Sequence, residues 1–316
     1  MSEPKSLQEA ILYFSNPDNC LSYLVARRWP KGVTCPTCGS EKVSFSASRR
    51  IWQCGSHHAK RQFSVKVGTI FEDSPISLDK WLAATWMLTN CKNGISSYEV
   101  ARAIGVTQKS AWFMLHRVRL ALQDETFGQL TGEVEVDETF IGGKARNMQL
   151  AKRAKKITGT GGKDKMPVLG MLQRGGNVRT SVIPNRRKNA LQTKVHQDVT
   201  VGSALFTDSL PSYNGLEAEY AHQIIDYAVA YVDGRVHTNG LENYWALLKR
   251  GIKGTYVSVE PFHLFRYLDE QSFRYNQREL PNDGDRFSNA VSQVIGKHLT
   301  WDKLTGKEPD AKKQPN

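Results

Sequence analysis

Three acidic residues lie in sequence contexts that suit metal-dependent chemistry on a phosphodiester. Asp137 lies within a strand-like segment, Asp208 closes another, and Glu242 falls in the first turn of an expected helix. Carboxylates from two strands and one helix that converge on a sheet face can hold two Mg²⁺ ions about 3.5–4 Å apart. Such a pair activates an attacking oxygen and stabilises the leaving one in phosphoryl transfer. For each acid taken alone, the alternative is a solvated or helix-capping role.

The strand that contains Asp137 has an acidic face. In residues 133–141 the side chains alternate between two faces, which puts Glu133 and Glu135 on the same face as Asp137. Carboxylates on a central strand are costly without a nearby cation, so we expect positive charge at this face.

Basic residues follow Glu242 along its helix. Lys249 comes two turns after Glu242 and lies on the same helical face. Because Arg250 and Lys253 follow closely, we expect this segment to hold a DNA phosphate near the metal ions. The alternative is a solvated basic face.

Cysteine and histidine spacing predicts a separate structural Zn²⁺ site. Cys35 and Cys38 form one knuckle, and Cys54 with His57 forms another at the same spacing. Four nitrogen and sulfur ligands bind Zn²⁺ tetrahedrally in a closed site, so its role is folding and DNA contact rather than catalysis. His58 is the alternative fourth ligand, and the spacing of the first knuckle favours His57. The competing interpretation is an ordinary core thiol at Cys54 beside two surface histidines.

Residues 97–107 have the features of a helix-turn-helix. Apolar residues recur at helical spacing, Gly105 falls at the turn, and Thr107 suits the N-cap of the next helix. The residues expected to meet base edges at the start of that helix are Gln108, Lys109 and Ser110. Arg117 and Arg119 are expected to reach phosphates. A three-helix packing unit without a DNA role is the alternative.

Hydrophobic periodicity predicts the elements that position these residues. The expected strands are residues 133–142, 167–172, 178–184, 201–207 and 222–227. The expected helices are residues 6–28 with a break near Asn16-Pro17, 78–90, 96–103, 107–122, 189–198, 240–251 and 261–275. The fold class is therefore multidomain, α+β and α/β.

Four segments follow from these patterns. They are residues 1–72 with an N-terminal helix and zinc ribbon, 73–128 with the helix-turn-helix, 129–280 with the catalytic domain, and 281–316 as a lightly folded tail. Residues 144–165 form a basic stretch that contains Lys144, and we expect a loop with DNA contacts there.

Composition indicates a polyanionic partner. The 316 residues include 43 Lys and Arg against 31 Asp and Glu, a formal net charge of +12. Residues 1–70 contribute +6 and residues 144–165 contribute +7, so two local patches account for the excess. The absence of a long apolar run and of a signal-peptide pattern predicts a cytoplasmic protein without a membrane partner, and five cysteines suit a reducing compartment.

With these residues assembled, the sequence resembles bacterial insertion-sequence transposases of the DDE type, which carry an N-terminal zinc ribbon and an ISXO-like catalytic domain. The motifs that carry the resemblance are Cys35-Pro36-Thr37-Cys38, Phe63-Ser64-Val65, Gly68-Thr69-Ile70-Phe71, Thr107-Gln108-Lys109-Ser110-Ala111-Trp112, Val136-Asp137-Glu138-Thr139, Gly142-Gly143-Lys144, Thr207-Asp208, His237-Thr238-Asn239-Gly240-Leu241-Glu242-Asn243-Tyr244-Trp245 and Leu248-Lys249-Arg250-Gly251. One departure is the ribbon's last ligand, which in such proteins is usually Cys and here is His57 or His58.

The resemblance implies a ribonuclease H-like catalytic domain, a mixed sheet with flanking helices. It assigns Asp137, Asp208 and Glu242 to a triad that binds two Mg²⁺ or Mn²⁺ ions, with Lys249 as an added lysine. It also implies cleavage at terminal inverted repeats, strand transfer to target DNA, and a homo-oligomer on DNA associated with the bacterial nucleoid. Two alternatives stay open: a DNA-binding regulator whose third domain is inert, and a ribonuclease H-like nuclease without strand transfer.

Overall fold

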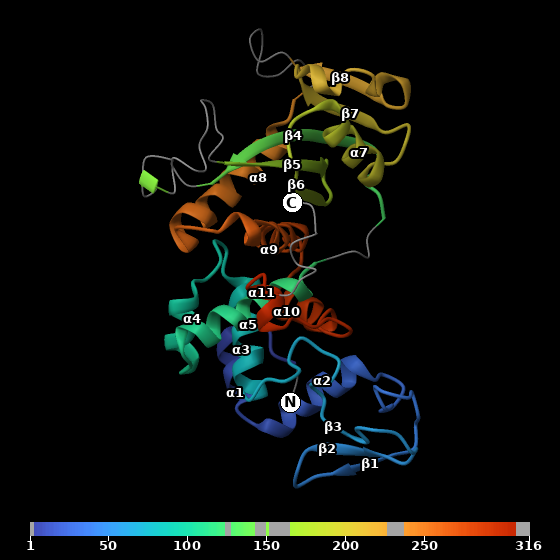
Figure 1. The fold of residues 1–316 in the computed structure, drawn as a ribbon, viewed down its shortest axis with the longest axis vertical. Helices are drawn as coiled ribbons and strands as arrows, with labels where there is room; N and C mark the ends of the chain where they lie inside the picture. The colour runs from blue at the N-terminus through green and yellow to red at the C-terminus, as the bar shows by residue number, and fades with distance from the viewer. Residues whose placement is uncertain (1–2, 124–127, 143–149, 152–164, 226–236, 308–316) are drawn as a thin grey trace. The chain divides into compact units, whose positions relative to one another are not determined.

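The computed structural model describes residues 3–123, 128–142, 150–151, 165–225 and 237–307 (Figure 1). They form two compact units, one from residues 3–123 with 279–307 and the other from residues 128–278. No helix in these described ranges combines the length and apolarity needed to cross a membrane. The boundary expected between residues 72 and 73 lies inside the first unit and stays a prediction.

The first unit begins with two helices, α1 (Leu7–Phe14) and α2 (Pro17–Arg28). The expected break between them is present because Asn16 caps α2, its side chain accepting a hydrogen bond from the backbone of Asp18 at 2.9 Å. Pro17 occupies the first turn of α2, where a missing backbone donor has no cost.

Three short strands form an antiparallel ribbon in the order β1-β2-β3. Their bounds are β1 Val43–Ser46, β2 Ile51–Cys54 and β3 Gln62–Phe63. The rings of Trp52 and Phe63 stack 5.9 Å apart across the paired strands, and the Trp29 ring packs edge-on against both. This aromatic cluster is a small core, as a metal-stabilised ribbon of this length requires.

The expected helical module follows as α3 (Leu78–Asn90), α4 (Ser97–Ile104) and α5 (Gln108–Ala121). Ser96 and Glu99 form a capping box at the start of α4, and α4 ends at Gly105, whose φ of 62° is left-handed. The Thr107 side chain then accepts a hydrogen bond from the backbone N–H of Ser110, so the predicted N-cap of α5 is present.

The C-terminal segment differs from the expected lightly folded tail. It contains α10 (Asp283–Ser292) and α11 (Trp301–Leu304), and α10 packs against α2 and α3. Phe287 is fully buried, with the rings of Phe14, Tyr23 and Trp86 at 4.9–5.7 Å. The sequence of α10 is mostly polar, and its apolar residues become a core only against helices that come at least 200 positions earlier.

The packing of Phe287 yields a stability prediction. Replacing Phe287 with Ala removes a ring from a filled core, and we expect the free energy of unfolding to fall by about 3–5 kcal/mol. Phe262→Ala is the control because its side chain is 39% exposed. Urea unfolding of the full chain monitors both, and an equal loss in the two variants would contradict the role of α10.

The second unit is built on a five-stranded mixed sheet in the order β6-β5-β4-β7-β8 (Figure 1). The strand bounds are β4 Glu133–Ile141, β5 Met166–Gln173, β6 Val178–Val182, β7 Ala204–Asp208 and β8 Ala221–Ile225. β5 is antiparallel to both β4 and β6, whereas β7 is parallel to β4 and β8. The sheet therefore changes from antiparallel to parallel pairing at β4.

Helices cover both faces of this sheet. α7 (Lys188–Asp198) packs on one face through Leu191 and Val195, in a core with Val134 and Val136 of β4. The helices of the other core are α8 (Asn239–Arg250) and α9 (Leu264–Asn276). Shorter turns are the 3₁₀ segments Pro211–Tyr213, Leu216–Ala218 and Pro261–His263 and the π-helical segment Gly251–Tyr256. The expected mixed sheet with flanking helices is thus confirmed.

Candidate active site and metal centre

Two of the three predicted acids meet where β7 ends. β4 and β7 pair in parallel with Glu135 opposite Phe206, and the same register continued by two residues puts Asp137 beside Asp208. Carboxylate oxygens of Asp137, Glu138 and Asp208 all lie within 4.8 Å of one another. Oxygen ligands of this kind suit hard divalent cations such as Mg²⁺ and Mn²⁺.

Glu138 is the member of this group that sequence reasoning missed. Its carboxylate accepts a hydrogen bond from the hydroxyl of the buried Tyr213 at 2.7 Å. The available signal was its place directly after Asp137, but alternation along a strand assigned it to the opposite face. β7 ends at Asp208, whereas β4 continues to Ile141. Asp137 and Glu138, which point to opposite faces of β4, therefore both lie near Asp208 at the end of β7.

α8 brings the remaining predicted residues to the same side of the sheet. The Trp245 indole donates a hydrogen bond to Oδ2 of Asp137 at 2.9 Å, and Glu242 precedes Trp245 by three residues. The charge of Glu242 acts to raise the pKa of Asp137, and the charge of Asp137 acts to raise the pKa of Lys249. Among the described residues, however, Glu242 is not one of the three acids whose oxygens lie within 4.8 Å of one another. Its side chain is exposed at the start of α8.

Burial makes the acidic site favour protons when no cation is present. It raises the pKa of Asp137 to about 6, against the opposing hydrogen bond from Trp245. It raises the pKa of Glu138 to about 7, with the nearby charges of Asp208 and Asp137 adding to the shift. The pKa of Lys249 is lowered, chiefly by burial and by Lys253. A bound divalent cation reverses the balance at the acids by favouring the charged carboxylates.

The second candidate metal site lies in the ribbon. Sulfur and nitrogen atoms of Cys35, Cys38, Cys54 and His58 lie within 4.8 Å of one another. Sγ of Cys38 is 3.6 Å from Sγ of Cys54, and Sγ of Cys35 is 3.5 Å from Nε2 of His58. Three thiols and one imidazole at such distances are a donor set for structural Zn²⁺.

The structure corrects the fourth ligand from His57 to His58. Nδ1 of His58 lies 2.6 Å from the carbonyl oxygen of Ala59, which orients the ring with Nε2 toward the thiols. The turn after β2 presents the fourth residue beyond Cys54 rather than the third. Equal knuckle spacing, which favoured His57, does not hold in this turn.

Comparisons with known proteins agree with both sites. Residues 129–276 match the family described as ISXO2-like transposase domain, and residues 15–58 match the family described as transposase zinc-ribbon domain. The chain therefore matches the models of a transposase domain and of a transposase zinc ribbon, one after the other. An "Uncharacterized protein in transposable element ISH50" of Halobacterium salinarum is 29% identical over 255 residues, which cover 75% of this chain and 83% of the relative. An "Uncharacterized transposase-like protein" of Haemophilus influenzae is 28% identical over 104 residues, 33% of this chain and 84% of the relative.

The two matched ranges contain the two candidate sites. The zinc-ribbon range ends at His58 and so includes all four candidate Zn²⁺ ligands. The transposase-domain range includes the whole five-stranded sheet with α7, α8 and α9, and the ribonuclease H-like fold fits it. The helix-turn-helix module lies between the matched ranges.

The residues predicted to read DNA bases lie at the start of α5. Nε2 of Gln108 donates to the Ser97 hydroxyl at 2.8 Å, and Nζ of Lys109 lies 4.6 Å from the ring centroid of Trp301. Ser110 donates its backbone N–H to the N-cap Thr107. Base recognition by these three residues stays a prediction, and Gln108 and Lys109 would have to exchange contacts within the protein for contacts with bases.

The expectation that Arg117 and Arg119 reach phosphates is wrong. Arg117 is 4% exposed, and its guanidinium donates hydrogen bonds to the backbone carbonyls of Ile70, Glu72 and Leu299. Arg119 is 1% exposed. Every residue from Met114 to Arg119 is buried, so this part of α5 is enclosed on all sides and neither arginine meets solvent.

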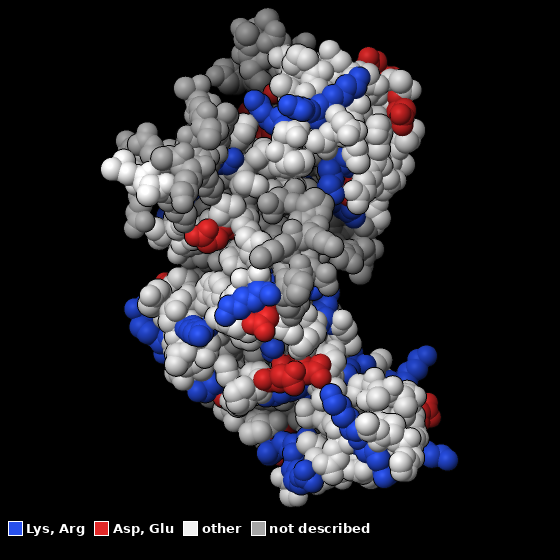
Figure 2. Space-filling model, in the orientation of Figure 1, with Lys and Arg blue, Asp and Glu red and all other residues white. Residues whose placement is uncertain are grey.

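Other basic residues are placed at the surface. Arg250 and Lys253 are exposed at and just beyond the end of α8, whereas Lys144 and most of residues 144–165 lie outside the described residues. On the ribbon, Lys42 and Lys60 are exposed, and Figure 2 shows basic side chains over this part of the first unit. The expected basic character of the ribbon is therefore present at its surface.

The corrected ligand set yields a metal-content prediction. We expect His58→Ala to lower the Zn²⁺ content of the purified protein well below one ion per chain and to destabilise the ribbon, because a structural site loses one of four ligands. His57→Ala is the matched control and retains Zn²⁺. Mass-spectrometric metal analysis of both proteins distinguishes them, and the reverse pattern would restore His57 as the ligand.

The raised pKa values yield a pH prediction. Glu138 has a pKa of about 7 in the folded protein against an ordinary 4.5, so the folded state holds a proton that the unfolded state releases. The protonated Glu138 carboxyl therefore makes its full contribution to the free energy of unfolding below about pH 4.5, and this contribution is lost as the pH rises through 7. With Mg²⁺ and Mn²⁺ absent, we expect Glu138→Gln to show a smaller fall in the free energy of unfolding between pH 5 and 7 than the wild type. Urea unfolding across this range measures it, and parallel curves would contradict the shift.

Proposed function

We propose that this protein binds the terminal inverted repeats of an insertion sequence and catalyses cleavage and strand transfer of its DNA with two divalent metal ions. The observation that carries the proposal is the meeting of Asp137 and Asp208 on adjacent parallel strands, within a domain that matches the ISXO2-like transposase family. An acidic centre on a mixed sheet, beside exposed basic residues, suits a polyanionic substrate.

Asp137, Asp208 and Glu242 would hold two Mg²⁺ or Mn²⁺ ions, with Glu138 close enough to add a carboxylate oxygen. When bound, such ions activate the attacking oxygen and stabilise the leaving oxygen of an in-line phosphoryl transfer. Trp245 orients the Asp137 carboxylate through its hydrogen bond. The exposed start of α8 leaves the Glu242 carboxylate accessible from solvent, where DNA approaches.

Lys249 has the role of a phosphate contact beside the metal ions. It is half-buried on α8, and Asp137 is among the charges that act on its ammonium group. Arg250 and Lys253 extend the basic surface beyond the helix end, and Lys144 lies in the chain segment that follows β4. A positive surface of this kind neutralises the DNA backbone and positions the scissile phosphate without reading sequence.

The first unit supplies recognition of the element's ends. The Zn²⁺-stabilised ribbon brings a basic surface to the DNA backbone. Gln108, Lys109 and Ser110 would meet base edges from the start of α5, the usual reading position of a helix-turn-helix. Because two ends of one element have to be cut and joined, the active form is a homo-oligomer on DNA. The acid cluster favours this transposase over a regulator with an inert third domain.

Substitution of the acids tests the proposal. Asp137→Ala, Asp208→Ala and Glu242→Ala should each abolish Mg²⁺- or Mn²⁺-dependent cleavage and joining while leaving end binding intact, because the DNA-binding residues are elsewhere. The substrates are oligonucleotides that carry the DNA bordering the coding region, with a supercoiled plasmid as target. Undiminished strand transfer in any one variant refutes that residue's role. Cleavage without joining by the wild type supports the nuclease alternative.

A further inference from the structure

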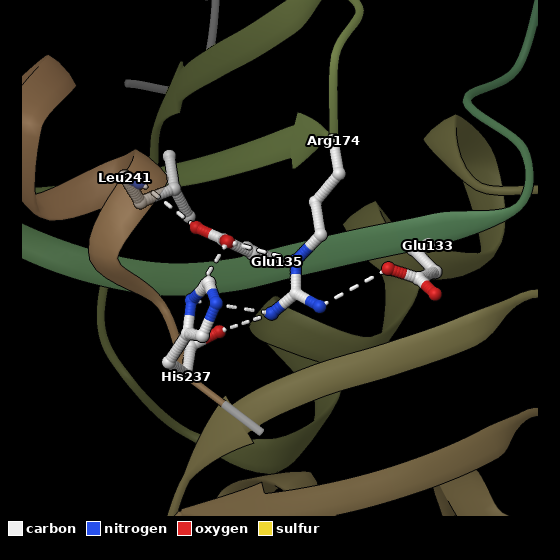
Figure 3. A network of polar contacts seen from close by, with 5 residues as sticks. All are labelled: Glu133, Glu135, Arg174, His237 and Leu241. Atoms are coloured by element: carbon white, nitrogen blue, oxygen red, sulfur yellow. Dashed lines mark hydrogen bonds and ion pairs between the residues drawn. The ribbon is translucent and has the colours of Figure 1, made fainter. Parts of the chain in front are cut away.

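A buried polar network connects the start of α8 to β4 (Figure 3). Glu135, two residues before Asp137, is 1% exposed. Its Oε2 accepts a hydrogen bond from the backbone N–H of Leu241 at 3.0 Å. Its Oε1 accepts one from Nε of Arg174 at 3.0 Å and lies 3.4 Å from Nδ1 of His237. One carboxylate therefore contacts α8, the residues just before it, and the neighbouring strand end.

Arg174 is the cation expected beside the acidic face of β4. Its guanidinium lies between the carboxylates of Glu133 and Glu135 in Figure 3, with Nη1 3.1 Å from Oε2 of Glu133. Nη2 donates to the backbone carbonyl of His237 at 2.8 Å, and the guanidinium stacks 3.9 Å from the ring centroid of Phe206. The buried charge of Glu135 is thus paired and hydrogen-bonded, as a buried charge must be.

Glu135 takes the place of a helix N-cap for α8. The residue at the N-cap position, Thr238, makes no side-chain capping hydrogen bond. The first backbone N–H groups of a helix have no partner within the helix, and Leu241 is the third residue of α8. A carboxylate from β4 satisfies that donor and also complements the positive end of the helix dipole.

A second contact fixes α8 to the same strand one turn later. Trp245 donates its indole hydrogen bond to Asp137 at 2.9 Å. Along α8, Leu241 and Trp245 are about 6 Å apart, and along β4, Glu135 and Asp137 are about 7 Å apart. Because the two spacings match, both contacts form together and set the position and rotation of α8 against β4.

Glycine allows close approach at both contacts. A Cβ on Gly240 would lie 2.8 Å from Oε2 of Glu135 and 2.6 Å from Cδ2 of Leu172. A Cβ on Gly170, which is paired with Asp137 across β4 and β5, would lie 2.5 Å from the Trp245 ring. Larger residues at either position would push α8 away from the strand.

From this geometry we infer that Glu135 is a positioning residue for Glu242. Glu242 follows Leu241 directly and lies three residues before Trp245, on the same helical face. By holding the start of α8, Glu135 sets where the Glu242 carboxylate stands relative to Asp137. The inference rests on the proposed function in one respect, the assignment of Glu242 as the third metal-binding carboxylate.

Binding of Mn²⁺ alone to the full-length, Zn²⁺-loaded protein tests the inference without DNA or activity. Free Mn²⁺ is counted by electron paramagnetic resonance at a temperature well below unfolding. Glu135→Gln should weaken Mn²⁺ binding by roughly tenfold, because residues that orient a metal ligand have effects of about this size. Gly240→Ala should weaken it similarly, since it displaces the helix start while keeping the Glu135 charge.

Two further variants make the outcome specific. Glu133→Gln removes the other carboxylate that pairs with Arg174 but keeps the hydrogen bond from Leu241 to Glu135, and it should leave the Mn²⁺ dissociation constant within about twofold. Wild-type binding by Gly240→Ala or by a folded Glu135→Gln protein overturns the inference, as does equal weakening by Glu133→Gln. Glu242→Ala separates the two claims: if it binds Mn²⁺ as the wild type does, the proposed ligand role of Glu242 fails. If only Glu242→Ala weakens binding, the positioning role alone fails.

Discussion

β4 and β7 lie side by side in parallel, and the site depends on this pairing. A parallel neighbour cannot follow through a tight turn, so the chain passes through β5, β6 and α7 before it returns as β7. The register then brings Asp137 and Asp208 together although they are 71 positions apart. A shift of one residue would turn alternate side chains to the other face and separate the acids.

Hydrogen bonds from polar side chains satisfy the carboxylates in and beside the acidic centre. Tyr213 donates to Glu138, Trp245 donates to Asp137, and Arg174 compensates Glu135. Burial nevertheless raises the pKa of Asp137 and of Glu138, so the fold keeps these acids in an arrangement that a cation stabilises. Protons that occupy these carboxylates would compete with a divalent metal for them.

Local signals were sufficient for much of the fold. The capping residues Asn16 and Thr107 and the left-handed Gly105 mark helix ends through contacts within a few residues, and the structure has all three. Apolar runs in the sequence predict the five strands of the sheet, and the observed strand bounds differ from the predicted ones by a few residues. The sequence does not predict α10, because its few apolar side chains find partners only on distant helices.

The sequence by itself was enough to predict candidate residues for the chemistry, namely the acids at 137, 208 and 242 and the three cysteines, and to predict the order of strands and helices around them. These follow from residue type, spacing and periodicity, which are local properties. Tertiary structure decided that Glu138 joins Asp137 and Asp208, that His58 rather than His57 faces the thiols, and that Arg117 is buried. It also decided that Glu135 caps a helix about a hundred residues away. Each of these depends on the direction of a side chain relative to a distant backbone, which spacing along the chain does not encode.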